Sequence, residues 1–140
     1  MSDNIQVVKG TEEEAAYVRH QLIAFNAKHV PDRRYEVVNL CLKNDAGDII
    51  AGLNSAVCWN WMEIDILWVD ENHRGDGLGS RLLLEAERIA REHICSFIKL
   101  NTFSFQAPEF YRKYGYEVVA MIEDAPSGYR HYFFKKQLQA

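Results

Sequence analysis

Apolar and polar positions follow a helical period near the start of the chain. Between Thr11 and Lys28 the apolar residues recur every three or four positions, so they share one face of a helix. Thr11 and Glu14 have the spacing of a capping box, which satisfies backbone N–H groups where a helix begins. We therefore predict a helix from Thr11 to about Lys28, followed by a loop at Pro31. Its apolar positions are Ala15, Val18, Leu22 and Phe25.

Runs of β-branched and aromatic residues, separated by turn residues, predict strands along much of the remaining chain. A turn at residues 45–48 joins two of these runs, as in an antiparallel hairpin. Two other runs flank a long helical segment, which predicts a parallel pair joined by a crossover helix. The predicted strands are 5–8, 35–44, 48–58, 61–69, 95–102, 116–122 and 129–138.

The crossover segment, residues 78–92, returns to the helical period with one apolar face. On its polar side we expect two solvent-exposed ion pairs, Glu85 with Arg88 and Glu87 with Arg91. Each pair has the spacing that brings two side chains together on one face of a helix.

A short third helix is predicted from Pro108, with Gly115 as its C-terminal stop. The elements together predict an α/β fold: a mixed, mostly antiparallel central sheet of six to seven strands flanked by helices. Because 140 residues is the size of one ordinary domain, we expect residues 1–140 to form a single domain.

Composition narrows the class of protein. The net charge is −4 and no block of Lys or Arg occurs, so the usual electrostatic footprint of a nucleic-acid-binding protein is missing. No apolar run approaches the roughly 18 residues of a membrane span, and the start of the chain has no signal pattern, so we expect a cytoplasmic protein. Cys41, Cys58 and Cys95 are widely spaced, and we expect free thiols and no metal site.

The segment HRGDGLGSRL, residues 73–82, lies between a predicted strand and a predicted helix. The first backbone N–H groups of a helix have no partner within it, and the helix dipole adds partial positive charge there. Glycine lets the backbone approach a phosphate closely. A pyrophosphate is therefore the expected ligand of this loop.

Two common phosphate-binding patterns do not match. A P-loop requires a lysine followed by Ser or Thr directly after its second glycine, and the loop has no such pair. The dinucleotide fingerprint requires a small residue where Leu82 stands.

A third pattern does match. The residues Arg74-Gly75-Asp76-Gly77-Leu78-Gly79 fit Arg/Gln-x-x-Gly-x-Gly, and about thirty residues later stands APEFYRKYGYEVV. With these two segments in this order, the chain resembles the GCN5-related N-acetyltransferases. The resemblance implies the fold of that family, acetyl-coenzyme A as co-substrate, and a primary amine of a small molecule or peptide as acceptor. The amine is expected to attack the thioester directly, through a tetrahedral intermediate.

The resemblance also assigns cofactor contacts. The pantetheine arm is expected to pair with the backbone of Leu67, Trp68 and Val69, and the Val69 N–H to hold the oxyanion. Ser104 stands where the family often carries an asparagine, so Ser104 or Asn101 is expected to orient the cofactor. The pyrophosphate contacts are expected from Arg74, Gly75, Asp76, Gly77, Leu78, Gly79 and Ser80.

Three residues are expected to carry the chemistry. Tyr111 occupies the position of the general acid that protonates the leaving thiolate, although packing against the sheet is an alternative. Glu63 and Asp65 are the candidate general bases for the acceptor amine, with Glu63 preferred. Residues two apart in a regular strand share a face, so both acids can serve one site unless a bulge intervenes.

Several alternatives stay open. Phe103 and Phe105 either line the cofactor groove or pack, and Tyr129 is among the residues expected near the acceptor. A non-catalytic acyl-coenzyme A sensor and a transferase of a longer acyl group are the rival functions. A homodimer is possible.

Overall fold

The computed structural model describes residues 3–138, and the chain divides into two compact units, Met1–Arg33 and Arg34–Ala140. The first unit contains helix α1 (Glu12–Ala27). The predicted capping box is confirmed: the Glu14 N–H donates to the Thr11 hydroxyl oxygen at 3.1 Å, and the Glu14 carboxylate accepts from the Thr11 N–H at 2.9 Å. The expectation that residues 1–140 form one domain stays a prediction.

The predicted strand at residues 5–8 is wrong. These residues are exposed and have no strand pairing. A strand is stable only where a neighbouring strand takes up its backbone N–H and C=O groups, and none of the strands described pairs with this segment.

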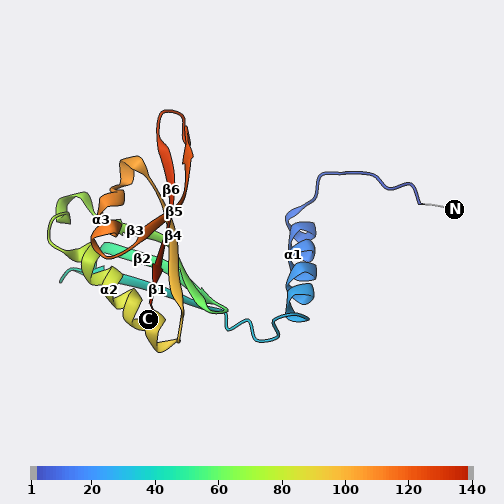
Figure 1. Cartoon of the computed structure of the whole chain (residues 1–140), viewed down its shortest axis with the longest axis horizontal. Coiled ribbons are helices and arrows are strands. Elements are labelled where there is room, and N and C mark those ends of the chain that lie inside the picture. The colour runs from blue at the N-terminus through green and yellow to red at the C-terminus, as the bar shows by residue number, and fades with distance from the viewer. Residues whose placement is uncertain (1–2, 139–140) are drawn as a thin grey trace. The chain divides into compact units, whose positions relative to one another are not determined.

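The second unit is built on one six-stranded sheet with the order β1-β2-β3-β4-β6-β5 (Figure 1). Only β3 and β4 are parallel, and every other neighbouring pair is antiparallel. This confirms the mixed, mostly antiparallel sheet. The strands are β1 (Glu36–Lys43), β2 (Ile49–Cys58), β3 (Trp61–Val69), β4 (Phe97–Phe103), β5 (Glu117–Glu123) and β6 (Arg130–Gln137).

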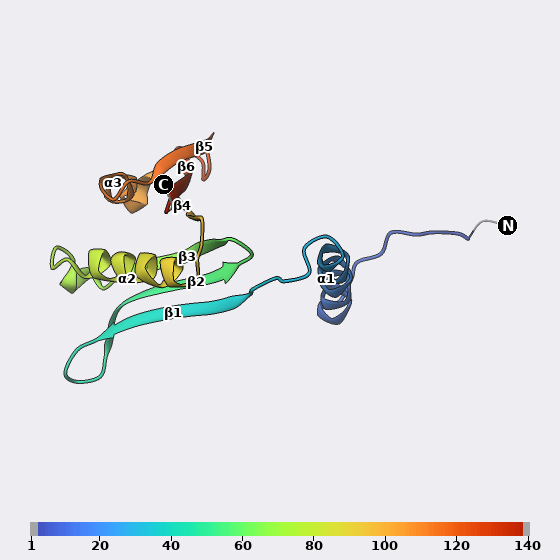
Figure 2. The same cartoon turned by 60° about the horizontal axis from the view of Figure 1, so that its bottom comes forward.

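Two helices flank the sheet. Helix α2 (Leu78–Glu92) is the predicted crossover between the parallel strands, and α3 (Pro108–Lys113) is the predicted short helix. Figure 2 shows α2 lying along the part of the sheet formed by β1, β2 and β3. Two 3₁₀ turns, η1 (Glu71–His73) and η2 (Ser104–Gln106), were not predicted. No helix among the described residues is long and apolar enough to cross a membrane.

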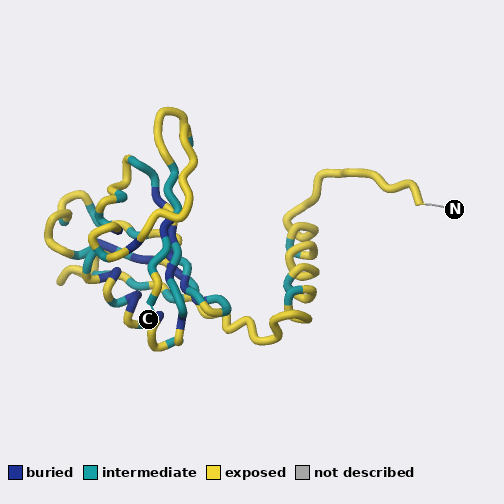
Figure 3. The backbone as a smooth tube through the Cα atoms, in the orientation of Figure 1, coloured by how far each residue is buried: buried dark blue, intermediate teal, exposed yellow. Residues whose placement is uncertain are grey.

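The core lies between the sheet and α2, where the buried positions of Figure 3 gather. Alternate residues of β2 and the start of β3 face the helix, as the period of two requires. The helix contributes one apolar stripe to the same core. The buried core residues from these elements are Ala51, Leu53, Val57, Met62, Ile64, Leu82, Leu83, Ala86 and Ala90.

Glu87 was expected on the exposed side of α2, and that expectation is wrong. Its side chain is only 2 % exposed. It accepts a hydrogen bond from the Tyr116 hydroxyl at 2.9 Å and forms an ion pair with Lys136 at 3.0 Å. The predicted ion pair with Arg91 is present at the longer distance of 3.9 Å. Strands β5 and β6 bring Tyr116 and Lys136 over this part of the helix, which spacing along α2 alone cannot reveal.

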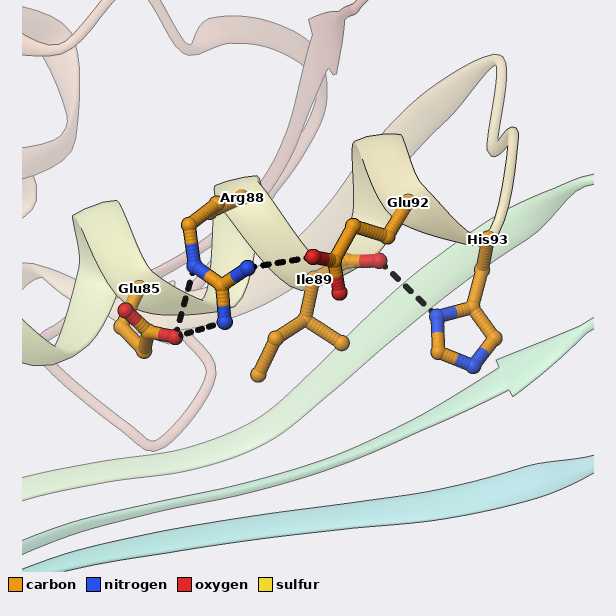
Figure 4. A network of polar contacts seen from close by, with 5 residues as sticks. All are labelled: Glu85, Arg88, Ile89, Glu92 and His93. Atoms are coloured by element: carbon orange, nitrogen blue, oxygen red, sulfur yellow. Dashed lines mark hydrogen bonds and ion pairs between the residues drawn. The ribbon is translucent and has the colours of Figure 1, made fainter.

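The exposed side of α2 carries the other predicted ion pair (Figure 4). Arg88 bonds Glu85 and also Glu92, as the spacing of three and four residues allows. Beyond the helix, His93 donates through Nδ1 to the Ile89 carbonyl at 2.9 Å and through Nε2 to the Glu36 carboxylate at 2.6 Å. Because both ring nitrogens face acceptors, these contacts favour the imidazolium form of the ring.

Strands β3 and β4 pair over only part of their length. Their parallel ladder runs from Trp61 with Phe97 to Ile64 with Leu100. Asp65 forms a bulge at this point, because Ser55 of β2 is opposite Ile64 and the next residue, Asn54, is opposite Ile66. Beyond the bulge the two strands separate, and the sheet opens between them.

Candidate active site

A cavity of about 890 Å³ lies where β3 and β4 separate. From Ile64 to Val69 the β3 side of this gap is about 16 Å long, at roughly 3.3 Å per residue. Strand β3, the glycine loop and the first turn of α2 form one side, and the end of β4, η2 and α3 form the other. Predicted site residues among its lining are Asp65, Leu67, Trp68, Val69, Arg74, Gly75, Gly77, Leu78, Gly79, Ser80, Asn101 and Tyr111.

The backbone of β3 faces the gap at alternate residues. The Asp70 N–H donates to the Ile50 carbonyl of β2 at 2.8 Å, so the backbone groups of residue 70 point toward β2. Alternation along a strand then directs Leu67 and Val69 toward the gap and Trp68 toward β2. Leu67 therefore offers the cavity its backbone N–H and C=O groups, and Val69 offers its N–H, while the backbone groups of Trp68 are directed to β2.

The glycine loop adopts a conformation that favours glycine. Gly75 has a φ of +89° and Gly77 a φ of +78°, a region that residues with a side chain adopt only at a cost. Arg74 turns back on the loop, and its Nε donates to the Val69 carbonyl at 3.3 Å. The loop is thus fixed to the end of β3, and its backbone runs along the cavity.

The first turn of α2 leaves its N–H groups available. Its N-cap is Gly77, which has no side chain to satisfy them, and the turn contains no acidic residue. Gly79 has no steric need to be glycine in this structure. A Cβ there would lie 3.5 Å from Phe110 and 3.7 Å from Val69, at ordinary contact distance. A Cβ at residue 79 would project among residues that line the cavity. Glycine at this position therefore keeps the approach to the first backbone N–H groups of α2 open.

Tyr111 presents a protonated phenol to the cavity. Its side chain is 8 % exposed and packs edge-on against the rings of Phe110 and Tyr116. Burial raises the pKa of Tyr111 to about 12, because the phenolate would lose its hydration. At neutral pH this residue can therefore give a proton but cannot serve as a base.

The two candidate acids differ in their surroundings. Glu63 lies 3.5 Å from the Lys99 ammonium and does not line the cavity, whereas Asp65 lines it. Asp65 has no ion-pair partner among the described residues. Desolvation, with a smaller contribution from the negative charge of Glu63, raises the pKa of Asp65. The bulge therefore places Asp65 at the point where the strands separate while leaving Glu63 close enough to influence it.

Comparison with known proteins identifies the family. The family model described as "Acetyltransferase (GNAT) family" matches residues 7–116, a range that includes every residue lining the cavity. The chain belongs to the GNAT family of acetyltransferases. It is 41% identical over 107 residues to a blasticidin-S acetyltransferase of Streptomyces morookaense, with 76% of this chain and 79% of that protein aligned.

Solved structures agree with the family. The crystal structure of an acetyltransferase from Bacillus cereus has a TM-score of 0.90 and 41% identity, and the match covers 96% of this chain and 98% of that one. A streptothricin acetyltransferase of Bacillus anthracis, solved in complex with acetyl coenzyme A, shares the fold with a TM-score of 0.64 and 22% identity, over 74% of this chain and 63% of that one. Membership of the family makes the protein an acyltransferase enzyme, in preference to the sensor considered from the sequence.

Some predicted site residues of this acetyltransferase lie outside the cavity lining. These are Glu63, Asp76 and Ser104. Ser104 accepts a hydrogen bond from the Arg130 N–H at 3.0 Å, which ties η2 to β6. Asn101 does line the cavity, and its side-chain oxygen lies 3.0 Å from Nε2 of His131.

Gln106 is a cavity residue of this acetyltransferase that sequence reasoning missed. Its side-chain oxygen accepts from the Phe103 N–H at 3.0 Å and from the Thr102 hydroxyl at 3.2 Å. Because these bonds fix which end of the amide is the oxygen, the NH₂ end is the donor available to a ligand. The position lies two residues past the expected asparagine, and only the η2 turn brings it to the cavity.

His73 and Lys113 also line the cavity without having been predicted. Both can carry positive charge, and His73 pairs with Asp70 at 3.1 Å. Helix α3 carries Lys113 to the side of the cavity opposite the glycine loop, which no motif in the sequence indicates. No group of three or more metal-ligating side chains occurs in the described part of the chain.

Proposed function

We propose that this protein transfers an acetyl group from acetyl-coenzyme A to a primary amine of a small molecule, by direct attack of the amine on the thioester. The observation that carries the proposal is the gap between β3 and β4, which joins free amides at the start of α2 to a protonated Tyr111. One cavity therefore offers an anion site, unpaired strand backbone and a proton donor.

The residues of the gap suit acetyl-coenzyme A. The first-turn amides of α2 and the backbone of residues 74–80 would hold its pyrophosphate. The pantetheine arm, which resembles a peptide, would pair with the backbone of Leu67 and Val69. The Val69 N–H would donate to the oxygen that gains negative charge, and the NH₂ of Gln106 would supply a further donor.

Tyr111 and Asp65 would divide the proton transfers. A lysine-like acceptor amine has a pKa of about 10.4, so freeing its lone pair at pH 7 costs roughly 4.6 kcal/mol. Asp65 lies in the cavity with a raised pKa and no cationic partner, so it is better placed than Glu63 to receive that proton, directly or through water. As the new C–N bond forms and the C–S bond breaks, Tyr111 would protonate the departing thiolate.

The acceptor is proposed from a relative. A protein that is 41% identical is named a blasticidin-S acetyltransferase. We therefore propose an antibiotic amine of that kind as the first acceptor to test. The volume of the cavity leaves a small molecule as the simplest acceptor beside the cofactor.

Two measurements test this function. Calorimetry should show binding of acetyl-coenzyme A, and release of the free thiol should depend on both acetyl-coenzyme A and an added amine such as blasticidin S. Binding without thiol release across a library of primary amines would contradict the proposed reaction. Absence of binding would contradict the cofactor assignment as well.

A further inference from the structure

Five aromatic side chains form a continuous cluster beside the cavity, which we call the aromatic shelf. The Phe103 ring stacks on Phe105 at 5.5 Å with 3° between the planes, and on His131 at 4.4 Å. Phe105 meets Tyr129 edge to face at 5.0 Å, and His131 contacts Phe133 at 4.3 Å. The aromatic shelf thus joins the end of β4, the η2 turn and the β5–β6 hairpin. Its members are Phe103, Phe105, Tyr129, His131 and Phe133.

The aromatic shelf continues into the cavity. Phe105 is itself a lining residue, and His131 is bonded to the lining residue Asn101. Phe105 is 57 % exposed and Tyr129 is 49 % exposed, although both are large rings in mutual contact. The open part of the aromatic shelf therefore borders the cavity and can take another planar group.

A negative charge lies near Asn101, the cavity residue that is bonded to His131 of the aromatic shelf. Asp65 and Asn101 directly follow the last paired residues of β3 and β4, Ile64 and Leu100. The charge of Glu63 is opposed by Lys99, which also lies 5.2 Å above the ring of Trp61. Asp65 is exposed and has no ion-pair partner among the described residues, so its carboxylate is accessible to a ligand cation.

We propose that the acceptor is a primary amine attached to a planar, unsaturated ring, with its ammonium group at Asp65 and its ring on the aromatic shelf. This inference rests on the proposed function. An aromatic ring gains from stacked or edge-on contact with Phe105 and Tyr129, whereas a puckered ring of the same size cannot stack. The aromatic shelf therefore selects among amines that present the same charge to Asp65.

A matched pair of amines tests the selection. 2-Phenylethylamine and 2-cyclohexylethylamine have the same charge and chain length and differ in the planarity of the ring. We expect the native enzyme to give a kcat/KM about fivefold higher for the phenyl compound, the ratio that one aromatic pair supplies. Phe105→Leu and Tyr129→Leu should each lower that ratio toward one.

Leu84→Ala is the matched control, because Leu84 is an exposed apolar residue of α2 outside the cavity lining. It should keep the native ratio, and acetyl-coenzyme A affinity measured by calorimetry should be the same in all variants. Equal kcat/KM for the two amines in the native enzyme, with acetyl-coenzyme A binding intact, would overturn the role of the aromatic shelf and leave the transferase proposal standing. Loss of acetyl-coenzyme A binding in the native protein would overturn both.

Discussion

At the scale of single residues, the chemistry depends on how burial separates groups of similar type. Tyr111 and Tyr129 are both tyrosines near the cavity, but Tyr111 is buried with a raised pKa, whereas the Tyr129 side chain is half exposed. Glu63 and Asp65 are two residues apart, but only Glu63 has a lysine beside it. In each pair, the environment determines which residue suits proton transfer.

Replacing Tyr111 tests the acid. Tyr111→Phe removes the proton donor while keeping the ring that packs on Phe110 and Tyr116. We expect kcat to fall by about 10²-fold or less, because a thiol with a pKa near 8.5 leaves tolerably as an anion. Steady-state kinetics with acetyl-coenzyme A near saturation measures the change. Since the pKa of Tyr111 is about 12, the native enzyme should show no loss of activity from its ionisation up to about pH 10. An unchanged kcat in the variant would remove Tyr111 from the mechanism.

Replacing Asp65 tests the base. Asp65→Asn should lower kcat/KM for an alkylamine at pH 7 by about 10²-fold or more, and the loss should shrink toward pH 10, where the amine is deprotonated without help. The carboxylate of Asp65 is the active form, and its pKa is raised. As the pH is lowered, the native activity should therefore begin to fall at a higher pH than the ordinary pKa of an aspartate would give. Glu63→Gln is the matched control and should change the pH profile little. A larger effect from Glu63→Gln would exchange the two assignments.

At the scale of elements, the site is assembled by two interruptions of regular structure. The bulge at Asp65 ends the pairing of β3 with β4, and the glycine loop begins α2 without a side-chain cap. Each interruption leaves backbone N–H and C=O groups unpaired along the cavity. Such unpaired groups would cost free energy if they faced apolar surroundings. A ligand with a peptide-like arm and a pyrophosphate can satisfy both sets.

Replacing Gly79 tests the start of α2. Gly79 has an ordinary φ and room for a Cβ, so Gly79→Ala should keep or raise thermal stability, by up to about 1 kcal/mol. Acetyl-coenzyme A should nevertheless bind at least about tenfold more weakly, since one hydrogen bond to a charged group contributes about 1.5–3 kcal/mol. Calorimetry and a thermal melt separate the two effects. Unchanged affinity in Gly79→Ala would place the pyrophosphate elsewhere.

At the scale of the whole molecule, the sheet of the unit Arg34–Ala140 is open between β3 and β4. Each side of this gap is stabilised by its own packing contacts. The core between β1–β3 and α2 holds one half, and the ring contacts of Tyr111, Tyr116 and Phe134 hold α3 to the other. Glu87 links them, because it lies on α2 and bonds Tyr116 and Lys136. The gap can remain open because neither half depends on β3–β4 pairing beyond Ile64.

The link between α2 and β1 gives stability a pH dependence. The hydrogen bond to the Ile89 carbonyl, together with the bond to Glu36, raises the pKa of His93. A raised pKa means that the contribution is fully present below the unfolded value of about 6.5 and is lost as pH rises through the folded value. We expect at most about 1 kcal/mol, because Glu36 is exposed to solvent and salt.

Thermal melts of the native protein and His93→Gln between pH 6 and pH 9 measure this contribution. The native protein should exceed the variant in Tm at pH 6, and the difference should shrink with rising pH. Glu36→Gln should reduce the same difference. A difference that grows toward alkaline pH would mean that the imidazolium is not the stabilising form.

The sequence by itself determined most of the elements and the two signatures of this protein. Periodicity located α1, α2 and all six strands of the sheet, because burying one face of a helix or strand imposes a spacing that is visible along the chain. The glycines at 75 and 77 predicted the phosphate-binding loop, because positive φ is a local requirement that one residue type meets best.

The tertiary structure decided which of those residues act together. The bulge that turns Asp65 into the cavity depends on the register of β2 against β3, and the turn that brings Gln106 there depends on where β4 ends. Glu87 became buried where Tyr116 and Lys136 contact it, and residues 5–8 are not a strand in the structure. These outcomes depend on contacts between distant segments, and such contacts leave no period or spacing in the chain.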